Sequence, residues 1–174
     1  DGRAEMLDDW FDPAAQDEDL AEEIMRRSAS EEVLLLGRKT FEAFRSYWPH
    51  ATDDTTGVAA QLDAVDKRVV SSTMTDPGWQ NSQVISGDPL DAVRELRAAP
   101  GGDVCLTGSL ELAHAIIGAG LVDEYRMFVY PHWQGRGRGL FPDDVPVPRL
   151  RLAEAKSFAG GVVFLSYVPA EAAS

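Results

Sequence analysis

Three short segments of this chain combine the residue types that hold phosphate oxygens. They read Gly37-Arg38-Lys39-Thr40, Ser71-Ser72-Thr73 and Thr107-Gly108-Ser109. Glycine permits close backbone approach, arginine and lysine supply positive charge, and hydroxyl and amide groups donate hydrogen bonds. Such segments suit an anion, or a pyrophosphate seated on a helix N-terminus. Each segment also has a plainer interpretation, as a tight turn with a solvated basic pair, a loop start or a strand-to-helix junction.

The elements that must position these segments alternate along the chain. Apolar patterns predict buried strands over residues 33–36, 67–72, 83–86 and 103–107. Helical patterns fall at residues 17–30, 40–47, 58–65, 88–100 and 109–119. This alternation predicts a three-layer α/β/α domain with a mostly parallel central sheet. Ligands of such sheets bind beyond the carboxyl ends of the strands, so the three segments are expected to meet at one edge.

The two ends of the chain follow different patterns. Residues 123–130, 150–158 and 162–168 are predicted strands without helices between them, which gives antiparallel C-terminal strands. The last two are joined at Gly160-Gly161, and the first 16 residues predict an irregular loop with aromatic anchors. We find no repeat and no linker, so the whole chain, residues 1–174, is predicted to be a single domain.

The charge of the chain excludes some classes of partner. Its 174 residues carry a formal net charge of −13, and a surface this acidic repels nucleic-acid phosphates and anionic lipid. Residues 1–32 contain twelve acidic and three basic residues, so most of the excess lies there. One cysteine rules out an intrachain disulfide framework, and no apolar run reaches the length of a membrane span. These features predict a cytoplasmic protein that binds neither nucleic acid nor membrane.

The remaining residues with chemical potential offer few alternatives. The three histidines lack the spacing of metal ligands, and Cys105 lies in the middle of a predicted strand, so no metal site is predicted. His132 lies between Pro131 and Trp133 and is a candidate for contact with a substrate. Trp48, and the pair Trp10-Phe11, are aromatic enough to wall a pocket for a planar substrate, or to pack in the core or at its rim.

The order and spacing of these motifs resemble the dihydrofolate reductase-like superfamily. More closely, they are similar to bacterial dihydrofolate reductase family proteins, which are grouped with the reductase domain of riboflavin biosynthesis. The motifs that carry the resemblance are Val33–Glu42, Lys67–Ser72, Val104–Leu110, Gly120–Tyr125, Pro131–Phe141 and Asp1-Gly2-Arg3. They cover nearly the whole chain. The family's Gly-Gly pair is Gly108-Ser109 here.

The resemblance implies a dihydrofolate reductase-like fold that binds NADPH, and it implies a central strand before Asp1. The residues implied to hold the cofactor are Gly37, Arg38, Lys39, Thr40, Ser71, Ser72, Thr107, Gly108, Ser109 and Leu110. Asp19 is the nearest counterpart of the family's substrate-binding carboxylate and the candidate catalytic residue. Trp48 and His132 are the candidate substrate contacts.

The leading hypothesis is therefore an NADPH-dependent reductase. It would transfer hydride to a small planar heterocyclic or conjugated substrate, pterin-like or pyrimidine-like. The alternative is a non-catalytic nucleotide-binding or dimeric scaffold protein on the same fold, because a fold does not determine function. A third hypothesis is a flavin or pterin carrier that binds its ligand without turnover. A homodimer through the C-terminal antiparallel strands is a further expectation.

Overall fold

The chain divides into two compact units in the computed structural model, which describes residues 1–7, 10–11, 17–54 and 56–170. One unit contains residues 1–22 and 116–174, and the other contains residues 23–115. Part of the loop predicted over the first 16 residues, residues 8–9 and 12–16, lies outside the described residues.

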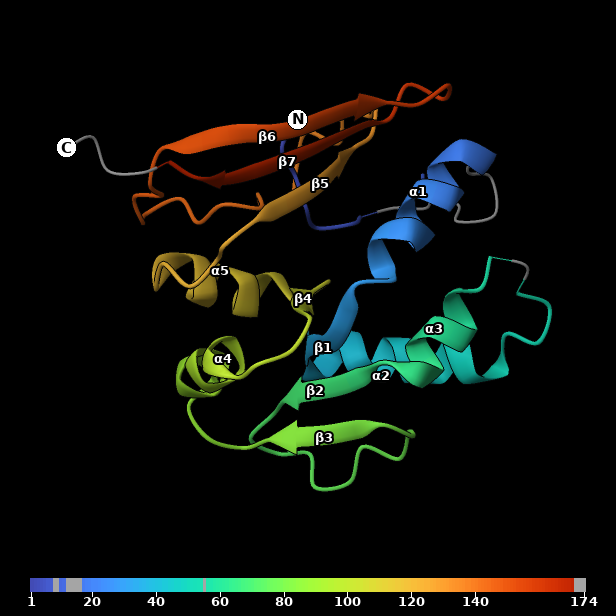
Figure 1. Cartoon of the computed structure of the whole chain (residues 1–174), viewed down its shortest axis with the longest axis vertical. Coiled ribbons are helices and arrows are strands. Elements are labelled where there is room, and N and C mark those ends of the chain that lie inside the picture. The colour runs from blue at the N-terminus through green and yellow to red at the C-terminus, as the bar shows by residue number, and fades with distance from the viewer. Residues whose placement is uncertain (8–9, 12–16, 55, 171–174) are drawn as a thin grey trace. The chain divides into compact units, whose positions relative to one another are not determined.

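The unit of residues 23–115 is built on a four-stranded parallel sheet (Figure 1). Its strands are β1 (Glu31–Gly37), β2 (Asp66–Val70), β3 (Ser82–Ile85) and β4 (Asp103–Leu106), in the order β3-β2-β1-β4. Leu34, Leu35 and Leu36 of β1 are almost completely buried, as expected for a central strand covered on both faces. The parallel sheet predicted from the alternation is confirmed.

Helices cover both faces of this sheet. α2 (Arg38–Tyr47) and α3 (Val58–Ala64) pack on one face, where Phe41 and Leu62 join Leu34, Leu36 and Val69 in the main core cluster. α4 (Pro89–Ala98) lies on the other side of the strands in Figure 1. A short 3-10 helix, Trp48–His50, extends α2 and was not predicted.

The other unit contains a separate antiparallel sheet. Its strands are β5 (Tyr125–Val129), β6 (Leu150–Ser157) and β7 (Val163–Pro169), in the order β5-β7-β6. The predicted turn between the last two strands is confirmed: the Phe158 amide donates to the Val162 carbonyl at 2.9 Å, and Gly161 adopts a φ of +81°. A side chain at that φ would be strained, which explains the glycine.

Two helices contain residues of both units. α1 (Glu18–Ser28) begins with acidic and ends with basic residues, as the helix dipole favours, and α5 (Leu110–Gly118) follows β4. The predicted fold class, a mixed α/β protein with a parallel sheet and antiparallel C-terminal strands, is confirmed. Among the described residues, every helix is too short or too polar to cross a bilayer.

Candidate functional site

The carboxyl ends of the parallel strands bring the three phosphate-type segments to one edge. In the sheet register Gly37 lies beside Val70 of β2, and Leu35 lies beside Leu106 of β4. The residues that follow β2 and β4 therefore flank the end of β1. Segments more than 30 residues apart in sequence become neighbours in this way.

Two glycines allow the segments at β1 and β4 to touch. A Cβ atom on Gly37 would lie 2.6 Å from the Cβ of Ser109, and one on Gly108 would lie 3.1 Å from Cγ2 of Thr40. The peptide bond between Gly108 and Ser109 is cis. We call this group of residues, Gly37–Thr40, Ser71-Ser72 and Thr107–Leu110, the strand-end cluster.

The N-terminus of α2 has no side-chain cap. Its N-cap residue, Gly37, has no side chain to accept a hydrogen bond from the first turn. The amides of that turn lack partners within the helix. The Nη1 atom of Arg38 donates to both carboxylate oxygens of Glu42, at 3.0 and 2.9 Å, while the Lys39 side chain is exposed. Arg38 is therefore engaged in an ion pair with Glu42, and Lys39 faces solvent.

Ser71 and Ser72 differ in what they can offer a ligand. The Ser71 hydroxyl accepts hydrogen bonds from the amides of Thr73 and Met74, at 3.2 and 3.0 Å, and its own amide donates to Ile85 at 3.1 Å. Both lone pairs of the Ser71 hydroxyl accept hydrogen bonds, and its amide already donates one. The hydroxyl hydrogen therefore remains as the group with which Ser71 could donate to a ligand. Ser72 is exposed.

The other helix N-termini at this edge are capped by side chains. The Ser109 hydroxyl accepts from the Leu112 amide at 3.4 Å, and Asp88 accepts from the Leu90 amide at 2.8 Å. Asp88 follows β3, so residues 86–88 form a fourth strand end at the same edge. We did not predict residues 86–88 as part of the site, although the Asp-Pro helix start after a strand was a usable signal.

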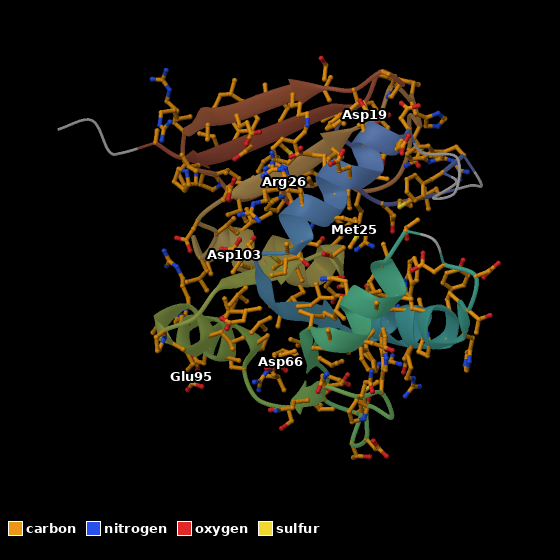
Figure 2. All side chains as sticks on the ribbon, turned by 45° about the vertical axis from the view of Figure 1, so that its right-hand side comes forward. Asp19, Met25, Arg26, Asp66, Glu95 and Asp103 are labelled. Atoms are coloured by element: carbon orange, nitrogen blue, oxygen red, sulfur yellow. The ribbon has the colours of Figure 1, made fainter. Side chains whose placement is uncertain are left out.

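Asp19, the candidate catalytic residue, is exposed in the first turn of α1. Its carboxylate accepts from the adjacent Leu20 amide at 2.9 Å. Figure 2 shows Asp19 near one end of α1 and Arg26 further along the same helix. The buried carboxylate of this helix is instead Glu23, 4% exposed, which pairs with Arg26 and Arg27. Sequence reasoning missed Glu23, because an acidic helix gives no signal of which carboxylate is buried.

The two candidate substrate contacts belong to different units. Trp48 packs against the core cluster at the far end of α2, about 15 Å along the helix from Arg38 at 1.5 Å per residue. His132 stacks on Trp10, with ring centroids 4.6 Å apart and an angle of 11° between the planes. Phe11 and Tyr130 meet Trp10 edge to face and complete an aromatic cluster. The structure thus separates Trp48 from the strand-end cluster and places His132 in the aromatic cluster.

The glycine-rich loop of residues 131–141 is bound by the first residues of the chain. The Asp1 carboxylate accepts from the amides of Gln134 and Gly135, at 3.1 and 2.7 Å. Arg138 donates to Glu5, and these hydrogen bonds hold the pKa of the Glu5 carboxyl below its usual value. Consecutive amides of this kind form an anion nest. Here a carboxylate of the same chain occupies it, so the loop is a structural connection rather than a phosphate site.

The described part of the chain contains no group of three or more histidine, cysteine, aspartate or glutamate side chains able to hold a metal ion. The donors at the strand ends are amides, hydroxyls and cations. This donor set binds anions and not metals.

Comparison with known proteins places this arrangement in a family. The chain is 31% identical over 137 residues to the uncharacterized protein YyaP of Bacillus subtilis (strain 168), covering 78% of this chain and 73% of YyaP. A putative riboflavin biosynthesis protein from Shewanella sp. PV-4 matches with a TM-score of 0.69 and 17% identity, over 92% of this chain and 84% of that one. A pyrimidine reductase-like protein from Corynebacterium diphtheriae matches with a TM-score of 0.66 and 16% identity, over 98% and 88%.

These structural matches show a dihydrofolate reductase-like fold, as the sequence resemblance implied. The sequence pattern of the RibD C-terminal domain family matches residues 1–164, which is nearly the whole chain. This chain therefore belongs to the RibD C-terminal domain family.

Proposed function

We propose that this protein is an NADPH-dependent reductase that acts on a small planar heterocycle with a pyrimidine-like or pterin-like ring. The family supports a reductase-type function. The observation that carries the proposal is the strand-end cluster, in which segments from β1, β2 and β4 meet at one edge of the parallel sheet.

The residues at this edge fit a dinucleotide with phosphate groups. The uncapped first turn of α2 presents amides to a phosphate, and Arg38 and Lys39 add positive charge. The Ser71 hydroxyl, saturated as an acceptor, is left to donate to a phosphate oxygen. The amide of Leu110, in the first turn of α5, would donate to the pyrophosphate. When bound, the cofactor supplies hydride, and the protein supplies binding, orientation and exclusion of water.

The aromatic cluster supports this class of substrate. Trp10, Phe11, Tyr130 and His132 present ring faces and edges, which suit a flat conjugated ring. One structural neighbour is named a pyrimidine reductase-like protein, and this name supports a ring of that kind as the substrate. Asp19 is proposed as the carboxyl that contacts the substrate and holds a proton.

A fluorescence titration with NADPH and with NADH tests the cofactor. We expect NADPH to bind more tightly, and the double variant Arg38→Ala/Ser71→Ala to lose about tenfold to a hundredfold in affinity, since two contacts to phosphate are removed. The matched control is Arg94→Ala/Ser46→Ala, which removes the same groups from exposed positions on α4 and α2. Unchanged affinity in the first double variant would show that the site assignment is wrong.

Consumption of NADPH with a panel of pyrimidines, pterins and quinones tests the reaction. A pyrimidine or pterin should support turnover, and Asp19→Asn should slow it while NADPH binding is retained. Binding of NADPH without consumption by any ring compound would favour the non-catalytic scaffold. Absence of nucleotide binding would contradict both the reductase and the nucleotide-binding scaffold.

A further inference from the structure

α2 begins with two cations at the end of a helix where cations are disfavoured. Arg38 and Lys39 are its first two residues, and its first turn contains no acidic residue. The N-terminal end of a helix carries a partial positive charge, so basic side chains there are destabilising. By contrast, α1, α4 and α5 have Glu18, Asp91 and Glu111 in their first turns. The start of α2 is therefore electrostatically unfavourable unless an anion is close to it.

Glu42 is the anion that meets Arg38 in the free protein. The Nη1 atom of Arg38 donates to the two carboxylate oxygens of Glu42 at 3.0 and 2.9 Å. Glu42 lies four residues further along α2, which is about 6 Å along the helix axis at 1.5 Å per residue. The ion pair therefore holds the charge of Arg38 toward the second turn of the helix, away from the open amides of the first turn.

Three features make this ion pair easy to exchange for another anion. The base precedes the acid along the helix, which is the weaker order for a pair of this spacing. One nitrogen serves both oxygens, whereas the strongest arginine–carboxylate pairs form two parallel hydrogen bonds. The Arg38 and Glu42 side chains are 41% and 38% exposed, so water and salt weaken their attraction. Glu42 does not engage Nη2 and Nε of Arg38, so an incoming phosphate reaches these atoms before Glu42 has to leave.

We propose that Glu42 competes with the phosphate of the ligand for Arg38 and thereby sets the affinity of the strand-end cluster for anions. This inference rests on the proposed cofactor site. A phosphate monoester carries a charge of about −1.5 to −2 at pH 7, which exceeds the single charge of Glu42, so the phosphate takes Arg38. Glu42 is then left without its partner and close to the phosphate, and both effects oppose binding.

The substitution Glu42→Gln removes the charge and keeps the size of the side chain. We expect it to raise the affinity for NADPH about threefold to tenfold, because Arg38 no longer has to leave a carboxylate and the phosphate is no longer repelled. The unfolding temperature without ligand should fall slightly, since Arg38 loses its partner, while the increase produced by NADPH should become larger. A residue with only a structural role would lower stability without raising affinity.

Fluorescence titration with NADPH and calorimetric titration with inorganic pyrophosphate test the competition in wild type, Glu42→Gln, Arg38→Gln and the double variant. Glu42→Gln should tighten the binding of both ligands when Arg38 is present. In the Arg38→Gln background the gain should shrink to within about twofold, which the double-mutant cycle reports as coupling. The matched control is Glu95→Gln, which removes the same charge from an exposed position on α4 and should leave both affinities within about twofold (Figure 2).

Each result separates the competition from the proposed cofactor site. Unchanged or weaker binding of both ligands by Glu42→Gln would overturn the competition while leaving NADPH binding by the wild type intact. An equal gain with and without Arg38 would also overturn it, because Glu42 would then repel anions without competing for Arg38. The expected pattern with pyrophosphate but no binding of NADPH would support the competition and contradict the cofactor. Absence of binding of either ligand by every variant would overturn both.

Discussion

Gly37 is the residue on which the strand-end cluster depends most directly. Its φ of −76° is open to any residue, so the glycine is required by space and not by backbone conformation. An added Cβ would lie 2.6 Å from the Cβ and 2.9 Å from the Oγ of Ser109. The contact joins the ends of β1 and β4, and a larger residue would push them apart.

We expect Gly37→Ala to lower the free energy of unfolding by about 1–3 kcal/mol, the usual cost of overpacking. NADPH affinity should fall with it. Gly87→Ala is the control, because a Cβ at Gly87 meets no atom within 4 Å, and it should be neutral or stabilising by about 0.5 kcal/mol. Urea unfolding measures both.

The double variant Gly37→Ala/Ser109→Gly removes the atoms that collide. It should recover most of the stability lost by Gly37→Ala alone, which a double-mutant cycle would show as a coupling energy. Simple additivity of the two substitutions would contradict the close contact.

Lys67 is a fully buried lysine that binds the end of α3. Its ammonium donates to the carbonyls of Leu62 and Val65 and lies 4.7 Å from the ring centroid of Trp79. Burial lowers the pKa of Lys67 below 10.5, although the charges of Asp63 and Asp66 oppose the shift. The folded protein therefore loses this proton at a lower pH than the unfolded chain.

Between the lowered pKa and pH 10.5 the unfolded chain binds more protons at Lys67 than the folded protein, so this residue makes stability rise with pH. We expect the rise to be absent in Lys67→Met and present in the control Lys156→Met, whose lysine is exposed. Urea unfolding from neutral pH to pH 10.5 measures it. An identical pH dependence in wild type and Lys67→Met would contradict the assignment.

At the scale of elements, Gln134 is the central link between the N-terminal segment, residues 1–7, and the glycine-rich loop. Its side-chain oxygen accepts from the Leu7 amide at 3.2 Å, and its side-chain nitrogen donates to the carbonyls of Glu5 and Arg136 at 2.9 and 2.7 Å. The same loop carries His132, which stacks on Trp10. The hydrogen bonds of Gln134 therefore help to position the aromatic cluster.

We expect Gln134→Ala to speed amide exchange in residues 1–7 by about tenfold, because each lost hydrogen bond contributes about 1 kcal/mol net. Global stability should fall by less than the sum of the three bonds, since the loop opens locally. Hydrogen–deuterium exchange measures the effect. Gln80→Ala, which loses one weak contact to Asp63 in the other unit, is the control and should leave residues 1–7 unchanged.

At the scale of the whole molecule, charge is distributed so that an acidic protein can bind an anion. Twelve of the 29 acidic residues lie in the first 32 positions, while the strand-end cluster carries Arg38 and Lys39. Local charge decides binding at short range, because solvent and salt screen distant groups.

Much of the fold could be predicted because its signals are local. The apolar run before Gly37, the Asp88-Pro89 helix start and the Gly160-Gly161 turn each specify an element from neighbouring residues. The observed bounds of the helices and strands differ from the predicted ones by only a few residues. The meeting of the three segments followed from topology, since parallel strands end at the same edge.

Burial and pairing could not be predicted in the same way, because they depend on residues far apart in sequence. Nothing in the pattern of α1 distinguishes Glu23 from Asp19, and only packing buries one and exposes the other. The Asp1 carboxylate meets amides more than 130 residues away, and this contact converted a possible anion nest into a structural link.

The sequence by itself therefore determined the order of elements, the family and the candidate cofactor segments, because each rests on local residue patterns. Only the tertiary structure decided which hydrogen-bond donors already have a partner in the chain and which glycines are needed for space. These properties arise from non-local packing, in which an atom's environment is set by chain segments that its neighbours in sequence do not specify.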